Sequence, residues 1–218
     1  LGELYFYQGK TEESKNQVEK ALVIGKSFKE KELKFVADCL QNIGEILMFK
    51  NDFESAKRLL CESNTIISAK FQNCPAFADN LSKLGHIFFH LGDFDKSSEY
   101  FNQSLHIAEK TIGKINLLYL DIIVRYSICL YHRKQFKSAY ELLTSMIKKV
   151  EHEKSSLDNL ELIRTTLYSR NGYCAMRMGL YEEARECFKI AMELHIARKN
   201  KFNQARVGKK IGILHYLE

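Results

Sequence analysis

Four segments of the chain align with one another without gaps, and this internal repetition restricts the possible folds more than any other feature. A small residue stands at the same place in each segment, and successive small residues are 41, 42 and 45 positions apart. These small residues are Gly44, Gly85, Ser127 and Gly172. A period of roughly 20–50 residues is typical of chains that stack copies of one supersecondary unit.

Three further positions repeat in the same register. An aromatic residue follows the small residue after nine positions, at Phe53, Phe94, Phe136 and Tyr181. Another small residue follows after twelve, at Ala56, Ser97, Ala139 and Ala184. A large apolar residue follows after sixteen, at Leu60, Phe101, Leu143 and Phe188. This second half of each unit has the pattern of an amphipathic helix.

The first half of each unit also has a helical period. Leu81, Leu84 and Phe88 surround Gly85 at i, i+3, i+4 and i+7, which places all four on one face. Glycine inside a helix costs about 0.5–1 kcal/mol relative to alanine, so its recurrence predicts close approach of a neighbouring helix. Asn51–Asp52 and Gly92–Asp93 then predict a turn followed by a helix N-cap.

Composition agrees with helices joined by short turns, because the 218 residues include one Pro and 11 Gly. No apolar run reaches the roughly 18 residues of a membrane-spanning helix, so we expect a cytoplasmic protein without a membrane partner. None of the six cysteines forms a Cys-x-x-Cys pair, which favours reduced thiols. The net charge of +6 is too modest to indicate a nucleic-acid partner.

The repeated pattern resembles the tetratricopeptide repeat family, and "LGHIFFHLGDFDKSSEYFNQSL", from Leu84 through Leu105, is a close match. The long period is similar to that of kinesin light chains, Pins-type spindle adaptors and Rap-type regulators. The resemblance implies an all-α fold, a right-handed α-solenoid of antiparallel helix pairs. It also implies a concave groove, lined by the first helices, that binds a protein or peptide without catalysis.

The register extends to both ends of the chain, through Gly2 and Gly212, which predicts a single repeat array. We place a truncated repeat at 1–30, four repeats at 31–72, 73–113, 114–155 and 156–200, and a first or capping helix at 201–218. A solenoid exposes an apolar face where it ends, so self-association through open ends is possible. If the last helix caps the array, we expect Arg206, Lys209 and Lys210 to solvate its outer side.

Three positions of each first helix are not needed for this packing and should face the groove. The position two before the small residue is basic in four successive repeats, at Lys83, Arg125, Arg170 and Lys210. The position one after it holds Glu45, His86, Ile128 and Tyr173. The position four after it is aromatic or methionine, from Phe6 to Tyr216. The predicted ligand-binding residues are Asn42, Glu45, Met48, Lys83, His86, Phe89, Arg125, Tyr131, Arg170, Tyr173 and Lys210.

These two stripes would suit a partner segment that carries acidic and apolar residues. Two structural interpretations remain open: the basic stripe as an ordinary solvated face, and the aromatic stripe as packing between neighbouring helices. The alternative function is a structural segment of a larger array or oligomer, with no ligand of its own. A chaperone-type carboxylate clamp does not fit, because only Asn42 matches an Asn of that clamp.

Two other groups of residues have structural interpretations. Asp38, Asp79 and Asp121 precede the small residue by six positions, and we expect them to complement the helix dipole. His86, His90 and His132 share a register but lack the pattern of a metal site, so we expect polar groove residues. No Walker, Gly-x-Gly-x-x-Gly or Gly-x-Ser-x-Gly motif occurs, so the sequence predicts no enzyme, metal or cofactor.

Overall fold

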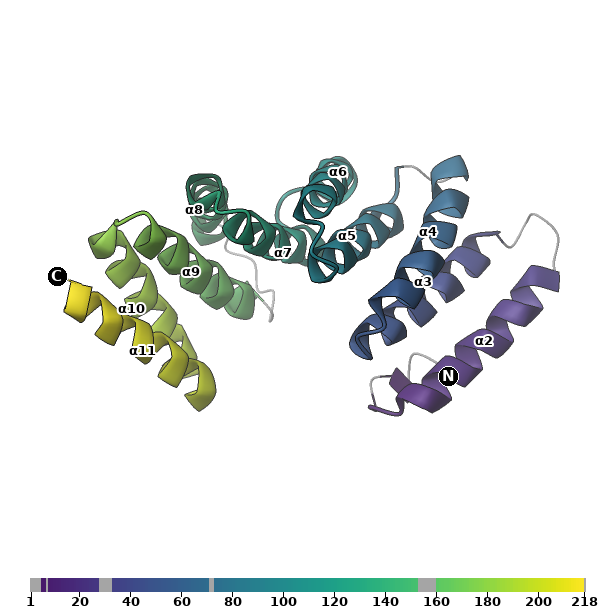
Figure 1. The fold of residues 1–218 in the computed structure, drawn as a ribbon, viewed down its shortest axis with the longest axis horizontal. Coiled ribbons are helices and arrows are strands. Elements are labelled where there is room, and N and C mark those ends of the chain that lie inside the picture. Colours follow the sequence, from purple (N-terminus) through teal and green to yellow (C-terminus); the bar gives the residue numbers. More distant parts are fainter. Residues whose placement is uncertain (1–4, 7, 28–32, 71–72, 153–159, 218) are drawn as a thin grey trace. The chain divides into compact units, whose positions relative to one another are not determined.

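The computed structural model describes residues 5–6, 8–27, 33–70, 73–152 and 160–217. These residues form ten helices in two compact units, Leu1–Thr111 and Ile112–Glu218 (Figure 1). The all-α prediction is therefore confirmed. Within the described part of the chain, no helix has the length and hydrophobicity needed to cross a bilayer. The repeat limits assigned from the sequence remain predictions.

The first unit contains α2 (Thr11–Ser27), α3 (Leu33–Phe49), α4 (Phe53–Lys70), α5 (Pro75–His90) and most of α6 (Phe94–Ile112). Consecutive helices pack against each other, from α2 on α3 to α4 on α5. One core joins Val18 of α2, Ile43 of α3, Leu60 of α4 and Leu84 of α5. Burying each of these apolar side chains contributes about 1.5–3 kcal/mol, so the packed face stabilises helices that would be marginal alone.

The second unit contains α7 (Leu117–His132), α8 (Phe136–His152), α9 (Leu160–Arg177), α10 (Tyr181–Ala197) and α11 (Lys201–Leu217). Here α8 packs on α7 and α9, and α10 packs on α9 and α11. The first helices α7 and α9 also contact each other directly. Ala175, Ala184, Phe188, Val207 and Leu214 form a buried core at the end built from α9, α10 and α11.

The recurring glycines lie where the two helices of a pair approach most closely. A Cβ on Gly44 would lie 2.9 Å from Cγ of Leu60, and one on Gly85 would lie 3.1 Å from the Phe101 ring. A Cβ on Gly172 would lie 2.8 Å from Cε1 of Phe188. Each glycine therefore meets the large apolar residue sixteen positions later, which confirms the predicted packing role. No described atom lies within 4 Å of the corresponding point at Gly212, and Gly2 lies outside the described residues.

The turns inside the helix pairs share one backbone conformation. Asn51, Gly92, Lys134 and Gly179, each seven positions after the small residue, have φ between 60° and 82°. This left-handed conformation ends a helix and lets the next residue's N–H bond back to an earlier carbonyl. Asp52 N–H accordingly donates to the Leu47 carbonyl at 2.9 Å. The turns predicted at Asn51–Asp52 and Gly92–Asp93 are therefore confirmed.

The predicted N-caps are confirmed as well. Asp52 Oδ1 accepts a hydrogen bond from the Ser55 N–H at 3.1 Å, and Asp93 Oδ1 accepts one from the Lys96 N–H at 3.1 Å. Hydrogen bonds from the side chain and backbone of Ser55 lower the pKa of Asp52, and those from the backbone and side chain of Lys96 lower the pKa of Asp93. Each cap satisfies backbone donors that the first turn of the helix leaves without intrahelical partners.

The six cysteines are free thiols, in agreement with the predicted reduced state. Cys174 is buried in α9, and burial raises the pKa of its thiol to about 12. Burial likewise raises the pKa of Cys187 to about 11, although its hydrogen bond with Asn171 acts in the opposite direction. Because the thiolate is the reactive form, both thiols are poor nucleophiles at neutral pH.

Candidate ligand-binding site

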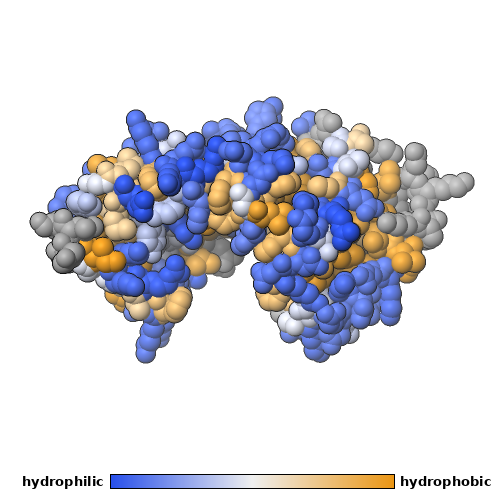
Figure 2. Space-filling view, in the orientation of Figure 1, coloured by the Kyte–Doolittle hydropathy of each residue, from blue (hydrophilic) through white to orange (hydrophobic). Residues whose placement is uncertain are grey.

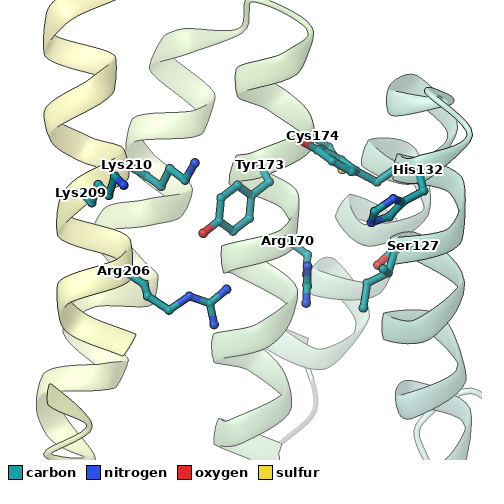
Figure 3. Close-up of a pocket in the computed structure, with 10 residues that line it drawn as sticks. Ser127, His132, Arg170, Tyr173, Cys174, Arg206, Lys209 and Lys210 are labelled. Atoms are coloured by element: carbon teal, nitrogen blue, oxygen red, sulfur yellow. The ribbon is translucent and has the colours of Figure 1, made fainter. Parts of the chain in front are cut away.

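The second unit contains a pocket of about 430 Å³ with a high density of positive charge. Three first helices supply its walls, and Figure 3 shows side chains from them extending into one space. We call it the basic pocket. Its lining residues are Ser127, Ile128, Tyr131 and His132 of α7, Arg170, Tyr173 and Cys174 of α9, and Arg206, Lys209 and Lys210 of α11.

Helical spacing explains why these residues meet. The lining residues of α9 and α11 occupy positions i, i+3 and i+4, as Arg206, Lys209 and Lys210 do. Such residues form one patch on a helix surface. Figure 3 shows Arg206 of α11 and Arg170 of α9 projecting toward the same space, with Tyr173 between their helices. The packing of the first helices therefore brings three such patches together.

The charges of the basic pocket are not balanced. Four lining residues are permanently or normally cationic, and no acidic residue is among the described residues that line it. Within the described ranges, Arg170, Arg206, Lys209 and Lys210 form no ion pair with a carboxylate. Burial lowers the pKa of Arg170, Tyr173 acts in the opposite direction, and the charge of Arg206 lowers it further. Arg170 remains protonated at neutral pH, but its charge is poorly solvated and is repelled by its neighbour.

Two tyrosines give the basic pocket fixed aromatic walls. The Tyr173 ring packs edge-on against Phe188 at 5.3 Å between centroids, and Lys210 Nζ lies 5.2 Å from the centre of the Tyr173 ring. The Tyr131 ring packs edge-on against Phe136 at 5.1 Å. These contacts orient both rings before any ligand arrives, so less side-chain entropy is lost on binding.

Four of the predicted ligand-binding residues line this one pocket: Tyr131, Arg170, Tyr173 and Lys210. Their role in binding remains a prediction. The expectation that Arg206, Lys209 and Lys210 lie on the outer side of the last helix is wrong, because all three face the pocket. Helix α11 packs against α10, and its cationic face is the one that the pocket uses.

Two other predicted cations lie in ion pairs. In the first unit, Lys83 Nζ lies 2.9 Å from Asp79 and 3.0 Å from Glu45. Burial alone would lower the pKa of Lys83, but these two carboxylates raise it overall. In the second unit, Arg125 Nε lies 2.6 Å from Asp121. The charge available to a ligand at these positions is therefore much smaller than at Arg170.

The same geometry corrects the interpretation of the aspartates. Helices α3, α5 and α7 have no acidic residue in the first turn. Asp79 and Asp121 lie one turn before Lys83 and Arg125 and pair with them at i, i+4. The predicted helix-dipole role is therefore wrong for this pair, because the dipole effect is confined to the first turn.

The remaining predicted residues lie in the first unit and are mostly engaged with neighbouring side chains. Met48 packs against the apolar core, and Phe89 contacts Phe94 at 5.5 Å between ring centroids. His86 lies with its Nε2 3.1 Å from Nε2 of His90, and Asn42 is half-buried. No group of three metal-binding side chains occurs among the described residues. Whether any of these residues contacts a ligand remains a prediction.

A signal in the sequence distinguishes the basic pocket from the paired positions. The residue four before the groove-facing position is acidic at Asp38, Asp79 and Asp121. The equivalent residue is Thr166, four positions before Arg170, in the next repeat. In the last helix it is Arg206, four positions before Lys210. Because residues at i and i+4 are neighbours on a helix, losing the acid leaves each of these cations without a partner on its own helix. All four residues of the basic stripe are therefore cations, but only Arg170 and Lys210 have a charge that no described carboxylate on the same helix neutralises.

A smaller pocket of about 120 Å³ shares Arg170, Tyr173 and Arg206 with the basic pocket, and His195 also lines it. His195 is buried, and burial lowers its pKa, with smaller effects in the same direction from Arg198 and Arg206. The folded-state pKa therefore lies below the ordinary value of about 6.5. Its sequence pattern gave no reason to expect this environment.

We expect this histidine to make the fold less stable in acid. Between the lowered folded pKa and about 6.5, the unfolded chain binds more protons, so the free energy of unfolding falls as pH falls through that window. Replacing His195→Gln should remove part of the decline seen in urea titrations between pH 7 and 5. The same urea titrations on His90→Gln give a comparison, because burial also lowers the pKa of His90. Equal pH slopes for wild type and His195→Gln would contradict this assignment.

The comparisons with known proteins agree with the helical architecture. Residues 78–111 match the family model described as tetratricopeptide repeat. The crystal structure of BtubC (BKLC) from P. vanneervenii is similar, with a TM-score of 0.82 at 12% identity, covering 92% of this chain and 79% of that one. No curated protein matches the sequence.

Two further structures extend the likeness. A putative kinesin light chain of Podospora anserina, with nearly identical repeats, has a TM-score of 0.77 at 16% identity, covering 92% of this chain and 94% of that one. A Rap protein complexed with competence and sporulation factor has a TM-score of 0.67 at 15% identity, covering 94% of this chain and 53% of that one. These identities establish similarity of fold alone. Residues 78–111 thus match one tetratricopeptide repeat, and the consecutive antiparallel helix pairs have the fold of tetratricopeptide repeat solenoids.

Proposed function

We propose that this protein is a non-catalytic interaction module that binds an acidic segment of a partner protein at the basic pocket. Tetratricopeptide repeat domains typically act as protein-interaction scaffolds. The observation that carries the proposal is the set of four cations without carboxylate partners in the described structure: Arg170, Arg206, Lys209 and Lys210. A Rap protein of similar fold has been solved with competence and sporulation factor bound, which supports a binding role for this architecture.

The chemistry of the lining favours acidic rather than neutral segments. Four cations around one pocket raise the local positive potential and attract carboxylates, and arginine can bind a carboxylate with two parallel hydrogen bonds. Tyr131 and Tyr173 add aromatic surface beside these charges. Tyrosine and arginine are enriched among residues that contribute strongly to protein interfaces. An acidic segment with apolar side chains would use both features.

The test uses the full 218-residue chain and synthetic peptides of acidic, neutral and basic composition, each with matched apolar content. We expect the acidic set to bind and the Arg170→Glu/Lys210→Glu double variant to lose about tenfold or more in affinity, because reversed charges repel the ligand. Raising the salt concentration should weaken binding, since exposed charges are screened. Equal binding of acidic and basic peptides would refute the proposal, as would unchanged affinity in the double variant.

Arg125→Gln provides a control at the equivalent position of the preceding repeat. Arg125 occupies the same repeat position as Arg170 in the same unit, but it is paired with Asp121 and does not line the pocket. Its replacement removes one positive charge without changing the pocket. We therefore expect the affinity of the acidic peptides to change by less than about twofold, and circular dichroism should verify that every variant is folded.

Association of copies with one another is the second candidate, because several large apolar side chains are exposed. In the second unit, Phe202 is 72% exposed and Ile196 is 56% exposed. Hydrophilic residues predominate on the face shown in Figure 2, and hydrophobic residues reach the surface at several places in each unit. Sedimentation at increasing concentration separates the candidates: an Ile196→Ser variant should dissociate an oligomer formed through this surface but leave acidic-peptide binding intact.

A further inference from the structure

We propose that the basic pocket holds a phosphorylated side chain of the bound segment, rather than a carboxylate alone. This inference rests on the proposed function and specifies which anion the pocket selects. Its basis is the combination of four cations with the hydroxyl groups of Tyr131 and Tyr173 around one cavity. The pocket thus contains more positive charge and more donors than a single carboxylate can use.

The charge balance distinguishes the two anions. A carboxylate carries one negative charge, whereas a phosphomonoester carries about −1.5 to −2 at neutral pH and presents three strong acceptor oxygens. Arg170 and Arg206 offer planar forks suited to two of these oxygens, and Lys209 and Lys210 add compact charges. A phosphate would therefore compensate roughly twice as much of the unbalanced charge as a glutamate side chain.

The position of Arg170 supports the same conclusion. It lies on α9, the middle of the three contributing helices, and Figure 3 shows its guanidinium directed into the space shared with Arg206. Burial and the neighbouring Arg206 both disfavour its charged form. An anion that reaches this guanidinium relieves both effects, and a dianion relieves them more than a monoanion.

The size of the pocket favours a side chain over a bare ion. Its volume of about 430 Å³ falls within the roughly 300–1,000 Å³ of pockets that enclose small organic ligands. A phosphate group alone would leave much of this space to water. The walls formed by Tyr131 and Tyr173 can contact the carbon atoms that connect the phosphate to a peptide backbone. The arrangement thus fits a phosphorylated residue within a partner segment.

The experiment compares four small probes with the full chain by NMR titration. The probes are N-acetyl-phosphoserine N-methylamide, N-acetyl-aspartate N-methylamide, inorganic phosphate and a short single-stranded RNA. We expect the phosphoserine probe to bind about tenfold or more tightly than the aspartate probe, because charge-assisted contacts to the second charge are added. Chemical shifts should change at Arg170, Tyr173 and Lys210 and remain nearly constant at Arg125.

Two variants make the result specific to the pocket. Arg170→Gln and Arg206→Gln should each reduce phosphoserine affinity by about tenfold, since each removes a bidentate donor. Arg125→Gln should leave that affinity within about twofold, because Arg125 already pairs with Asp121 outside the pocket. Equal losses in the Arg125 and Arg170 variants would overturn the proposal, because they would indicate a general charge effect.

Each probe excludes a different explanation. Equal affinity for the phosphoserine and aspartate probes would overturn phosphate selectivity while leaving the acidic-segment function intact. Inorganic phosphate binding as tightly as phosphoserine would overturn the claim that a side chain is recognised. RNA that displaces phosphoserine at equal phosphate concentration would assign the pocket to a nucleic-acid backbone and overturn the proposal. If none of the acidic synthetic peptides binds to the chain, that result refutes the proposed function itself.

Discussion

Replacing Phe188→Ala should lower the free energy of unfolding of the second unit by about 3–5 kcal/mol, the range typical of a large aromatic removed from a packed core. Phe188 is fully buried and contacts the place where Gly172 lacks a side chain. Its ring also packs against Tyr173, a wall of the basic pocket. The truncation therefore leaves a cavity in the core and removes the support of one pocket residue.

Urea denaturation followed by circular dichroism measures this effect, and Phe202→Ala supplies the matched control. Phe202 is 72% exposed, so its loss should change the free energy of unfolding by at most about 0.5 kcal/mol. A loss below about 1 kcal/mol in Phe188→Ala would contradict the packing described here. In a binding assay at low denaturant, Phe188→Ala should also weaken acidic peptides, because Tyr173 loses its fixed position.

The register of Phe188 is a feature that the sequence alone predicts well. The interval of sixteen residues between small and large positions recurs at Gly44–Leu60, Gly85–Phe101 and Gly172–Phe188, and all three pairs meet in the structure. Short-range periodicity suffices here because the two residues belong to adjacent helices of one pair. Contacts between such near neighbours follow from helix geometry and turn length, both of which are visible in the sequence.

The basic pocket depends on longer-range relations, so its composition was only partly predictable. Tyr131, Arg170, Tyr173 and Lys210 follow from the repeat register, but Arg206 and Lys209 lie outside the three positions chosen as groove-facing. The side of α11 that faces the pocket depends on its packing against α10, which the weak amphipathic pattern of α11 does not indicate. Which cations are neutralised depends on partners such as Glu45, which reaches Lys83 from another helix.

Neutralising Arg170 and Arg125 should change the free energy of unfolding in opposite directions, although the two residues occupy the same repeat position. Arg170→Gln removes a poorly solvated charge that Arg206 repels. Relief of unfavourable surface charge commonly stabilises a protein by about 0.5–2 kcal/mol, so we expect stabilisation near the lower end. Arg125→Gln breaks the pair with Asp121 and should destabilise by about 0.3–0.5 kcal/mol.

Salt should separate the two effects further. Screening weakens repulsion between the pocket cations, so added salt should stabilise the wild type and Arg125→Gln more than Arg170→Gln. Urea titrations of the three proteins at about 20 and 300 mM sodium chloride measure this difference, with the ionic strengths chosen to bracket a Debye length near 10 Å. Destabilisation in Arg170→Gln equal to that in Arg125→Gln would show that Arg170 has a stabilising partner. We expect Arg170→Gln to be more stable than the wild type and to bind acidic or phosphorylated probes about tenfold more weakly. This result would mean that the unpaired Arg170 contributes to ligand binding and not to the stability of the fold.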